Sequence, residues 1–265
     1  MATSSHRHGV VLLSAGRGSR MLPLTEGIPK SLLRVGDRLV LDWLIEAVLA
    51  RTDGEVVVVT GYAAERVEAH LCRYGERVRH VRNERYLEDV NILSVEVGVS
   101  ALKHPERGYL IVETDILLDD SAWDQIFDVA TGSARSHWVC KGVYGPHLTG
   151  GIVHARPDGA IDAVDYRPLY DPLFDGWAKM VGLLLVGPDE VAEDRRLRQA
   201  GISRTLAQYY LNPWLEGVDS LPSRLLQLGD DCFAQSFNTQ ADFQRVSRDF
   251  LALAGEASPA KVASK

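Results

Sequence analysis

SAGRGSRMLPLTEGIPK, residues 14–30, directly follows the apolar run VVLL at residues 10–13. A short apolar run that stops in glycines predicts a buried strand followed by a tight loop. Such a loop exposes backbone N–H groups, which can surround the oxygens of a phosphate. Gly16 and Gly18 permit backbone angles that cost an ordinary residue about 1–2 kcal/mol, and they let the chain approach a ligand closely. The stretch therefore predicts a first strand that leads into a loop suited to a triphosphate.

Positive charge is concentrated on the same loop. Residues 14–35 contain four basic residues and one acidic residue, although the whole chain of 265 residues has a formal net charge of −7. Arg17, Arg20 and Lys30 are the cations closest to the glycines. An acidic protein with one cationic loop is expected to use that loop on a small anion and not on nucleic acid.

Two familiar glycine-rich loops are excluded. A dinucleotide-binding fingerprint requires a third glycine at the position of Met21, and a Walker loop ends in Gly-Lys-Ser/Thr, whereas Lys30 follows Pro29. A simple glycine turn with solvated arginines remains the alternative interpretation of a Gly-x-Gly pair. The additional Pro23-x-Thr25 and Pro29-Lys30 elements argue against that alternative.

The distribution of apolar runs predicts an α/β fold with a doubly wound, mostly parallel, Rossmann-like sheet. Residues 10–13, 56–59, 78–81 and 109–112 are short apolar runs typical of buried parallel strands, and residues 41–49 have the apolar spacing of a helix. Ligands gather at the carboxyl ends of such strands, where Ser14, Gly61 and Asp115 fall. Beyond about residue 135, the runs at 151–154, 161–164 and 180–186 predict a smaller, antiparallel region. Thr239 and Asp242 predict the capped start of a last helix.

Composition indicates a cytoplasmic protein. No run approaches the roughly 18 apolar residues that a membrane span needs, and residues 1–8 lack the apolar segment of a signal peptide. Cys72, Cys140 and Cys232 are far apart and odd in number, which suggests neither a disulfide framework nor a zinc site. We expect residues 1–8 to be flexible and 255–265 to be disordered.

Several short motifs resemble those of one enzyme family. Besides the first loop, they are Val59-Thr60-Gly61-Tyr62, Asn83-Glu84-Arg85-Tyr86, Asn91-Ile92-Leu93-Ser94, Glu113-Thr114-Asp115 and residues 237–243. The chain resembles the nucleotidyltransferases, which include sugar-1-phosphate nucleotidylyltransferases and CTP:phosphocholine cytidylyltransferases. Order and spacing are most similar to the bacterial phosphocholine branch over roughly residues 9–250. The resemblance implies a GT-A-like domain at 9–254, with a nucleotide-binding half at 9–134 and an acceptor-binding half at 135–254.

The resemblance implies a Mg²⁺-dependent transfer of CMP from CTP to a small phosphomonoester or phosphonate, with release of pyrophosphate. By resemblance, Lys30 contacts the α-phosphate or the acceptor phosphate, Arg20 grips the leaving phosphates, and Asp115 binds the metal. An aspartate that caps the next segment is the alternative interpretation of Asp115. The second metal position is an aspartate in the phosphocholine branch and Asn238 here, an oxygen ligand without a formal charge. Glu113 is a further carboxylate close to this site.

Nucleotide and acceptor contacts are implied in the same way. The positions that match nucleotide contacts are Ala15, Gly16, Gly18, Ser19, Arg20, Tyr62, Asn83, Asn91 and Ser94. Asn91 and Ser94 could instead satisfy free N–H groups at a helix start. Relatives commonly have two successive asparagines where this chain has Val90-Asn91. The choice of CTP as the triphosphate therefore rests on the resemblance alone. Lys179 and Arg167 are candidate contacts for an anionic acceptor.

Three other functions are compatible with parts of the pattern. A sugar-1-phosphate nucleotidylyltransferase that uses UTP or dTTP would share most of the motifs. A nucleotide-binding sensor without catalysis is favoured by Asn238 and Val90, whereas a glycosyltransferase is suggested only by the partial Asp-x-Asp match at residues 113–115. The expected partners are a nucleoside triphosphate and a small metabolite, without nucleic acid or membrane. The helical surfaces and the aromatic second half could also support a homodimer.

Overall fold

The computed structural model describes residues 8–146 and 148–256. Four parallel strands form the first half of a large sheet, in the spatial order β6-β1-β4-β5. Their bounds are β1 Gly9–Ser14, β4 Val56–Thr60, β5 Val78–Arg82 and β6 Tyr109–Glu113. These bounds confirm the four parallel strands predicted from the apolar runs.

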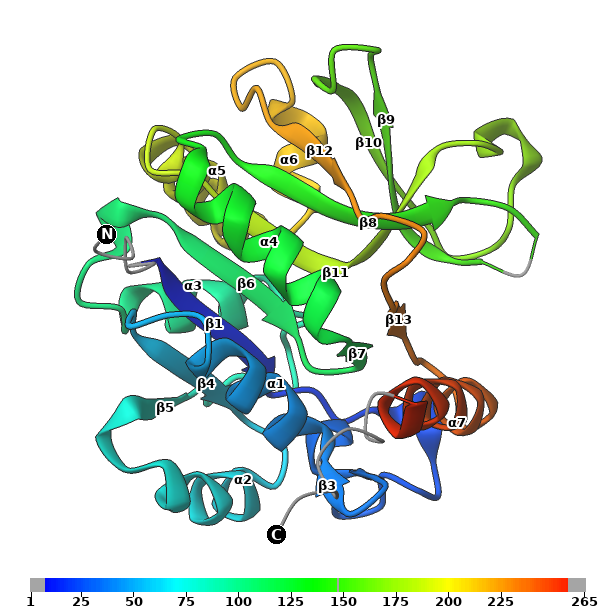
Figure 1. Cartoon of the computed structure of the whole chain (residues 1–265). Coiled ribbons are helices and arrows are strands. Elements are labelled where there is room, and N and C mark those ends of the chain that lie inside the picture. Colours follow the sequence, from blue (N-terminus) through cyan, green and yellow to red (C-terminus); the bar gives the residue numbers. More distant parts are fainter. Residues whose placement is uncertain (1–7, 147, 257–265) are drawn as a thin grey trace, which may run out of the picture.

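The second half of the sheet is mostly antiparallel, as expected. β11 pairs antiparallel with β6, β8 and β9, and the sheet ends with the hairpin of β9 and β10 (Figure 1). Only β12 runs parallel to its neighbour, β8. The bounds are β8 His137–Val143, β9 Gly150–Ala155, β10 Ile161–Arg167, β11 Ala178–Val186 and β12 Arg224–Gln227. Two small pairs lie outside this sheet: β2 Arg34–Val35 with β3 Arg38–Leu39, and β7 Ile116–Leu118 with β13 Ala234–Ser236.

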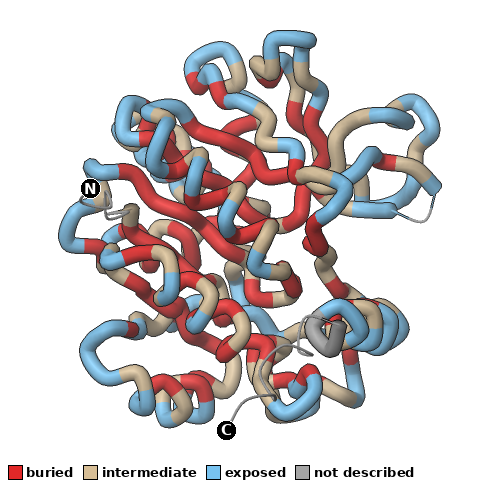
Figure 2. Tube along the Cα trace, in the orientation of Figure 1, coloured by how far each residue is buried: buried red, intermediate tan, exposed pale blue. Residues whose placement is uncertain are grey.

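Helices cover both faces of the sheet and create two cores (Figures 1 and 2). Alternate residues of a strand point to opposite faces, so Val10 and Leu12 pack in one core while Val11 packs in the other. The first core includes side chains from α1 Val40–Leu49, α2 Ala64–Leu71, α4 Asp120–Gly132 and α7 Gln240–Glu256. The second includes side chains from α3 Ile92–Ser100, α5 Val191–Arg204 and α6 Asn212–Gly217.

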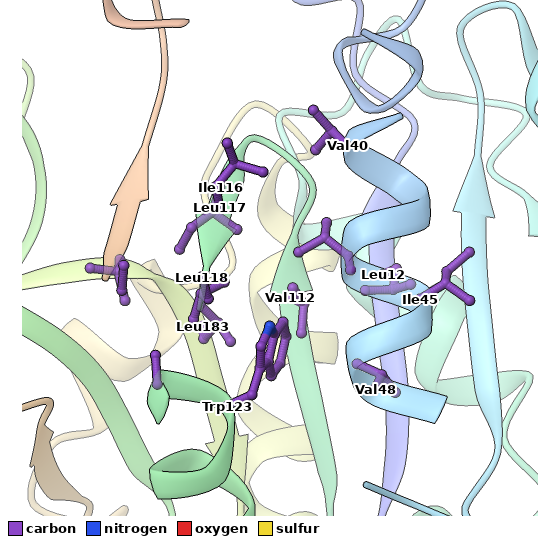
Figure 3. Close-up of a cluster of buried hydrophobic side chains, with 14 of the residues drawn as sticks. Leu12, Val40, Ile45, Val48, Val112, Ile116, Leu117, Leu118, Trp123 and Leu183 are labelled. Carbon is purple, nitrogen blue, oxygen red and sulfur yellow. The ribbon is translucent and has the colours of Figure 1, made fainter. Parts of the chain in front are cut away.

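The first core shows why the helix at residues 41–49 was predictable. Leu41, Leu44, Ile45 and Val48 recur at intervals of three and four, and all four are buried in this core. Figure 3 shows Ile45 and Val48 on the side of α1 that faces the other buried side chains. Burying one such side chain fully stabilises the fold by about 1.5–3 kcal/mol. The apolar stripe therefore fixes both the helix and the face that it covers.

On the other face, α3 lies unusually close to the sheet. A β-carbon on Gly98 would lie 2.3 Å from Cγ1 of Val11 and 2.7 Å from Cγ2 of Val59. Only glycine allows this approach, which seats α3 directly over β1 and β4. The start of α3 is thereby held beside the carboxyl ends of these strands.

The C-terminal segment matches the expectation from the sequence only in part. α7 begins as predicted, because Oγ1 of Thr239 accepts a hydrogen bond from N–H of Asp242 (3.1 Å) while Oδ2 of Asp242 accepts one from N–H of Thr239 (3.1 Å). It continues to Glu256, two residues into the tail that was predicted to be disordered. The rest of that tail and residues 1–7 lie outside the described residues.

Five short 3-10 helices complete the described elements: η1 Ser19–Met21, η2 Lys30–Leu32, η3 Cys72–Arg77, η4 Pro105–Arg107 and η5 Pro172–Phe174. None of the helices in the described ranges is long and apolar enough to cross a membrane.

Candidate active site

The strand order creates a crevice between β1 and β6. From β1 the chain adds β4 and then β5 on one side, and it returns to place β6 on the other side of β1. Such a reversal leaves an opening at the carboxyl ends of the two strands, where α/β proteins bind ligands. A cavity of about 430 Å³ lies here, lined by Leu13–Arg20, Pro29–Ser31 and Glu113–Asp115 together with residues of the second half. This volume suits a small-molecule site.

The glycine loop is held in shape by its own hydroxyl groups. Oγ of Ser14 and Oγ of Ser31 are 2.6 Å apart and both residues are buried, which closes the loop at its base. Oγ1 of Thr25 donates a hydrogen bond to the carbonyl of Gly18 (2.9 Å). η2 begins at Lys30, directly after Pro29 in an extended conformation. The loop therefore carries Lys30 back toward Gly18.

Only one of the two loop glycines needs to be a glycine for its backbone. Gly18 has φ +63°, and a β-carbon there would lie 2.8 Å from Cγ of Lys30. Gly16 has no positive φ, and a β-carbon there would meet nothing within 4 Å. Of the two glycines, Gly18 uses the backbone angles that glycine permits, whereas Gly16 does not. Any requirement for glycine at that position would have to come from a ligand.

This difference predicts a contrast between two alanine variants. Gly18→Ala should destabilise the fold by about 1–2 kcal/mol, because alanine resists the left-handed conformation, and should displace Lys30. Gly16→Ala is the matched control and should leave the free energy of unfolding unchanged. Urea unfolding of both variants measures this. Equal stability of the two variants would contradict the assigned backbone conformation.

Lys30 and Asp115 meet in the cavity. Nζ of Lys30 donates a hydrogen bond to Oδ2 of Asp115 at 2.8 Å, and their side chains are only 14% and 19% exposed. Asp115 lies two residues beyond the end of β6, which places its carboxylate at the mouth of the crevice. Asp119, not Asp115, caps the following helix, because its Oδ1 accepts the N–H of Ala122 (2.9 Å). The capping interpretation of Asp115 is therefore wrong.

A second contact joins the glycine loop to the C-terminal segment. Nη2 of Arg20 donates to Oδ1 of Asn238 at 2.7 Å, across 218 residues of sequence. Asn238 lies between β13 and α7, and α7 lies beside the N-terminal blue segment in Figure 1. Both oxygen groups that the resemblance implies as metal ligands thus accept a hydrogen bond from a cation of the glycine loop.

Two further charged side chains line the cavity. Burial, followed by the charge of Asp115, raises the pKa of Glu113 to about 7, although nearby cations act in the opposite direction. Burial lowers the pKa of Lys179. Nζ of Lys179 donates to the carbonyls of Met180 (2.7 Å) and Gly151 (3.3 Å). These groups lie on β6 and β11, which are adjacent strands of the sheet.

The loop before α3 is organised by Asp89, which the sequence analysis missed. Its carboxylate accepts the N–H groups of Leu93 (2.9 Å) and Ser94 (2.8 Å) and so caps the helix. Oγ of Ser94 also donates to Asp89, whereas Oδ1 of Asn91 accepts the N–H of Tyr210 (2.7 Å). The interpretation of Asn91 and Ser94 as capping residues is therefore wrong. An aspartate just before a helix start is a known capping signal and could have identified Asp89.

Three predicted contact residues do not line the cavity. Tyr62 lies behind the glycine loop, where its hydroxyl accepts the N–H of Gly27 (2.7 Å). Nδ2 of Asn83 donates to Asp89 and Ser94, so its side chain serves the loop before α3. Arg167 pairs with Asp165 and Asp171 and lies over the ring of Phe174.

The remaining predicted residues do line it: Ala15, Gly16, Gly18, Ser19, Arg20, Lys30, Asn91, Ser94, Asp115, Lys179 and Asn238. Tyr209, Tyr210 and Gly182 also line it but were not predicted as contacts, because the second half of the chain has no recognisable motif.

A family model described as the MobA-like NTP transferase domain matches residues 10–166, which is more than half of the chain. The chain belongs to this family. The matched range contains the glycine loop, Lys30 and Asp115, whereas Lys179, Tyr209 and Asn238 lie beyond it. The part of the cavity wall that includes Lys179 and Tyr209 therefore lies outside the family match.

Cytidylyltransferases are among its relatives. The NTP transferase is 31% identical over 121 residues to the 2-aminoethylphosphonate cytidylyltransferase of Lancefieldella rimae, covering 44% of the chain and 47% of the relative. It is 31% identical over 85 residues to the choline-phosphate cytidylyltransferase of Streptococcus pneumoniae, covering 32% of the chain and 36% of the relative. The chain thus spans about half the length, or less, of these curated relatives. The solved structure of the CTP:phosphocholine cytidylyltransferase of S. pneumoniae aligns with a TM-score of 0.76 at 17% identity, over 92% of this chain and 99% of that one. At this identity, the structural likeness establishes the fold.

The cavity of the NTP transferase has oxygen ligands that fit a magnesium ion. Mg²⁺ is usually bound by one or two carboxylates, with phosphates and water completing the shell. Asp115 supplies a carboxylate and Asn238 an amide oxygen, and each now accepts a hydrogen bond from a cationic side chain. No cluster of three His, Cys, Asp or Glu that could hold a metal occurs in the described ranges.

Proposed function

We propose that this NTP transferase is a Mg²⁺-dependent cytidylyltransferase that transfers CMP from CTP to a small phosphomonoester or phosphonate and releases pyrophosphate. One observation carries the proposal: the ion pair of Lys30 and Asp115 stands at the mouth of the crevice between β1 and β6. Cations for phosphate and a carboxylate for a metal are thus present in one cavity.

The reaction brings two anions together, and the chain's cations address that problem. Attack by an acceptor oxygen on the α-phosphorus needs charge neutralisation and an in-line arrangement of the attacking and leaving oxygens. Lys30, freed from Asp115, stabilises the charge at the α-phosphorus, while Arg20, freed from Asn238, binds the leaving phosphates. Magnesium, when bound, would supply further neutralisation of the phosphate charge. Asp115 and Asn238 are the residues that would hold it.

The preference for CTP is supported by relatives that are cytidylyltransferases by name. Ala15, Gly16, Gly18, Ser19, Asn91 and Ser94 line the cavity and are our candidates for contact with the nucleotide. On the other side, the wall that includes Lys179 would contact the acceptor.

A panel of triphosphates scored by pyrophosphate release tests this proposal. CTP, UTP, dTTP, ATP and GTP are each combined with phosphomonoester, phosphonate and sugar-1-phosphate acceptors, with and without Mg²⁺. We expect release that requires Mg²⁺ and is fastest with CTP and a small phosphomonoester or phosphonate.

The same panel separates the alternatives. A sugar-1-phosphate uridylyltransferase is a second candidate, because UTP--glucose-1-phosphate uridylyltransferase of Synechocystis is 24% identical over 91% of this chain. Turnover of UTP or dTTP with a sugar-1-phosphate would favour it. Tight CTP binding without turnover of any acceptor would instead favour a sensor.

Because Asn238 brings no formal charge to the metal position, we expect Mg²⁺ to bind weakly in the absence of nucleotide. One missing charge at about 4 Å corresponds to up to about 4 kcal/mol at an effective dielectric constant of 20, before water and phosphates compensate. Asn238→Asp should therefore bind Mg²⁺ without nucleotide at least about tenfold more tightly, a difference of about 1.4 kcal/mol. Titration calorimetry with Mg²⁺ alone measures this, and Asn212→Asp, outside the cavity lining, is the control.

Asn238→Ala completes the test of this ligand. It should lower turnover and raise the Mg²⁺ concentration needed for half-maximal rate, because one oxygen ligand is lost. Unchanged turnover and unchanged Mg²⁺ dependence would remove Asn238 from the metal site.

A further inference from the structure

Glu113 is a carboxylate for which the proposed transfer chemistry has no role. It is the last residue of β6, lines the cavity and is partly buried. Its neighbour on β11 is Gly182, which has φ +82°. A β-carbon on Gly182 would lie 3.0 Å from Oε2 and 3.2 Å from Cβ of Glu113. Glycine at this position leaves the space that the Glu113 side chain occupies.

The carboxylate of Glu113 has no ion-pair partner among the described residues. Its one hydrogen bond is a long one, 3.5 Å, from Nδ2 of Asn91. Lys30 is paired with Asp115, and Lys179 donates to backbone carbonyls. A partly buried carboxylate without a partner costs free energy. The position is therefore suited to a cation that a ligand brings.

Aromatic residues line the cavity on the acceptor side. The rings of Tyr166 and Tyr209 stack with centroids 4.3 Å apart, and their hydroxyls are 2.8 Å apart. Both rings line the same cavity as Glu113. Aromatic rings that share a cavity with a carboxylate are favourable surroundings for an organic ammonium group.

The cavity presents both cations and an unpaired carboxylate to a ligand. Arg17, Arg20 and Lys30 lie at the glycine-loop end, whereas Glu113 lies toward β11, where Nζ of Lys179 is engaged by backbone carbonyls. Glu113 precedes Asp115 by two residues, a spacing of about 6.5–7 Å between the α-carbons of an extended chain. A ligand that fits both ends has an anionic group and a cationic group separated by a short linker.

We propose that Glu113 binds the protonated amine of the acceptor and so selects phosphonates or phosphomonoesters that carry an amino group two or three carbons from the phosphorus-bearing end. The inference rests on the proposed function and specifies its acceptor class. Asn91 would act as a positioning residue, because its side chain contacts both Glu113 and the backbone of Tyr210.

Three phosphonates of similar length but different charge test the proposal in the unmodified enzyme. They are 2-aminoethylphosphonate, 2-hydroxyethylphosphonate and 3-phosphonopropionate, each with CTP, Mg²⁺ and a pyrophosphate readout. We expect kcat/KM for the amine to exceed that for the alcohol by roughly 10–100-fold, the usual value of a hydrogen bond to a charged group. The carboxylate should be the poorest acceptor.

Variants at Glu113 then assign the selectivity to this residue. Glu113→Gln should lower kcat/KM for the amine to near that for the alcohol, mainly through KM, and should leave the alcohol within a few-fold. Glu113→Asp should retain part of the preference. Glu216→Gln is the matched control, because Glu216 is exposed, pairs with Arg204 and does not line the cavity.

Specific outcomes would overturn the inference while leaving the proposed function intact. The first is equal use of the amine and the alcohol by the unmodified enzyme. The second is a preference for the carboxylate, which would point to Lys179 as the selecting residue. The third is a changed Mg²⁺ requirement in Glu113→Gln, which would make Glu113 a metal ligand. Absence of turnover with every triphosphate and acceptor class would overturn the proposed function and this inference with it.

Discussion

Replacing Lys30 with alanine should lower turnover by roughly 10²–10³-fold, the usual cost of losing one preorganised group that stabilises transition-state charge. Lys30 is the cation that contacts Asp115 in the crevice between β1 and β6. Its side chain is 14% exposed, so water cannot easily replace it. The loss should appear mainly in kcat, because the developing charge at phosphorus is greatest in the transition state.

Steady-state kinetics with CTP and the best acceptor of the panel measures the effect. Arg34→Ala is the matched control: Arg34 is a nearby cation that is exposed and does not line the cavity. Thermal unfolding of both variants shows whether the fold is kept, which we expect. A loss of less than tenfold in Lys30→Ala would remove Lys30 from the catalytic residues.

Asp115→Asn should abolish productive metal binding and lower turnover by at least about 10³-fold. A bound metal contributes several kcal/mol of charge stabilisation to such a transition state, and about 1.4 kcal/mol corresponds to each factor of ten. Asp115 is the one carboxylate that we assign to the metal, and Asn238 brings no charge to compensate for its loss. The variant also removes the ion-pair partner of Lys30.

Binding and catalysis should be measured separately for this variant. Mn²⁺ binding by electron paramagnetic resonance, with and without CTP, reports the metal site, and pyrophosphate release reports turnover. Asp120→Asn, at the exposed start of α4, is the control. Metal binding of unchanged strength in Asp115→Asn would show that the ion is held elsewhere.

The elements that the sequence predicted best are those with a local physical signature. β1, β4 and β6 follow from short, mostly aliphatic runs, because a strand that is buried on both faces needs no polar alternation. β5 lies at the edge of the sheet and contains Arg79 and His80 between its valines. The loop of residues 14–30 was predictable for the same reason, since glycine, proline and charge act over a few residues. Its central contact, between Lys30 and Asp115, follows from the carboxyl ends of parallel strands meeting at one edge.

The predicted contact residues that do not line the cavity differ from expectation in the direction of their side chains. Tyr62 and Asn83 occupy matching positions in short motifs, yet the structure directs them to the back of the glycine loop and to Asp89. A motif fixes the position of a residue along a strand end, but its hydrogen-bond partners come from segments that are distant in sequence. Arg167 was a candidate only through its charge, and Asp165 and Asp171 neutralise it locally.

The acceptor-side wall could not be predicted for a different reason. β11 joins β6 through antiparallel pairing between residues 183–186 and 109–112, more than 70 positions apart in the chain. Nothing in either segment alone indicates that Gly182 would make room for Glu113. The unpaired carboxylate that supports our acceptor proposal is therefore visible only in three dimensions.

The central place of β6 affects how the protein can respond to its substrates. One edge of β6 hydrogen-bonds to β1, which leads into the glycine loop, and the other edge to β11, which carries the opposite wall. Both walls are thus hydrogen-bonded to the same strand, β6. Moving the walls apart would break the backbone hydrogen bonds between neighbouring strands. We expect adjustment to come from swinging side chains, such as Lys30 and Arg20, and not from the closing of two lobes about a hinge.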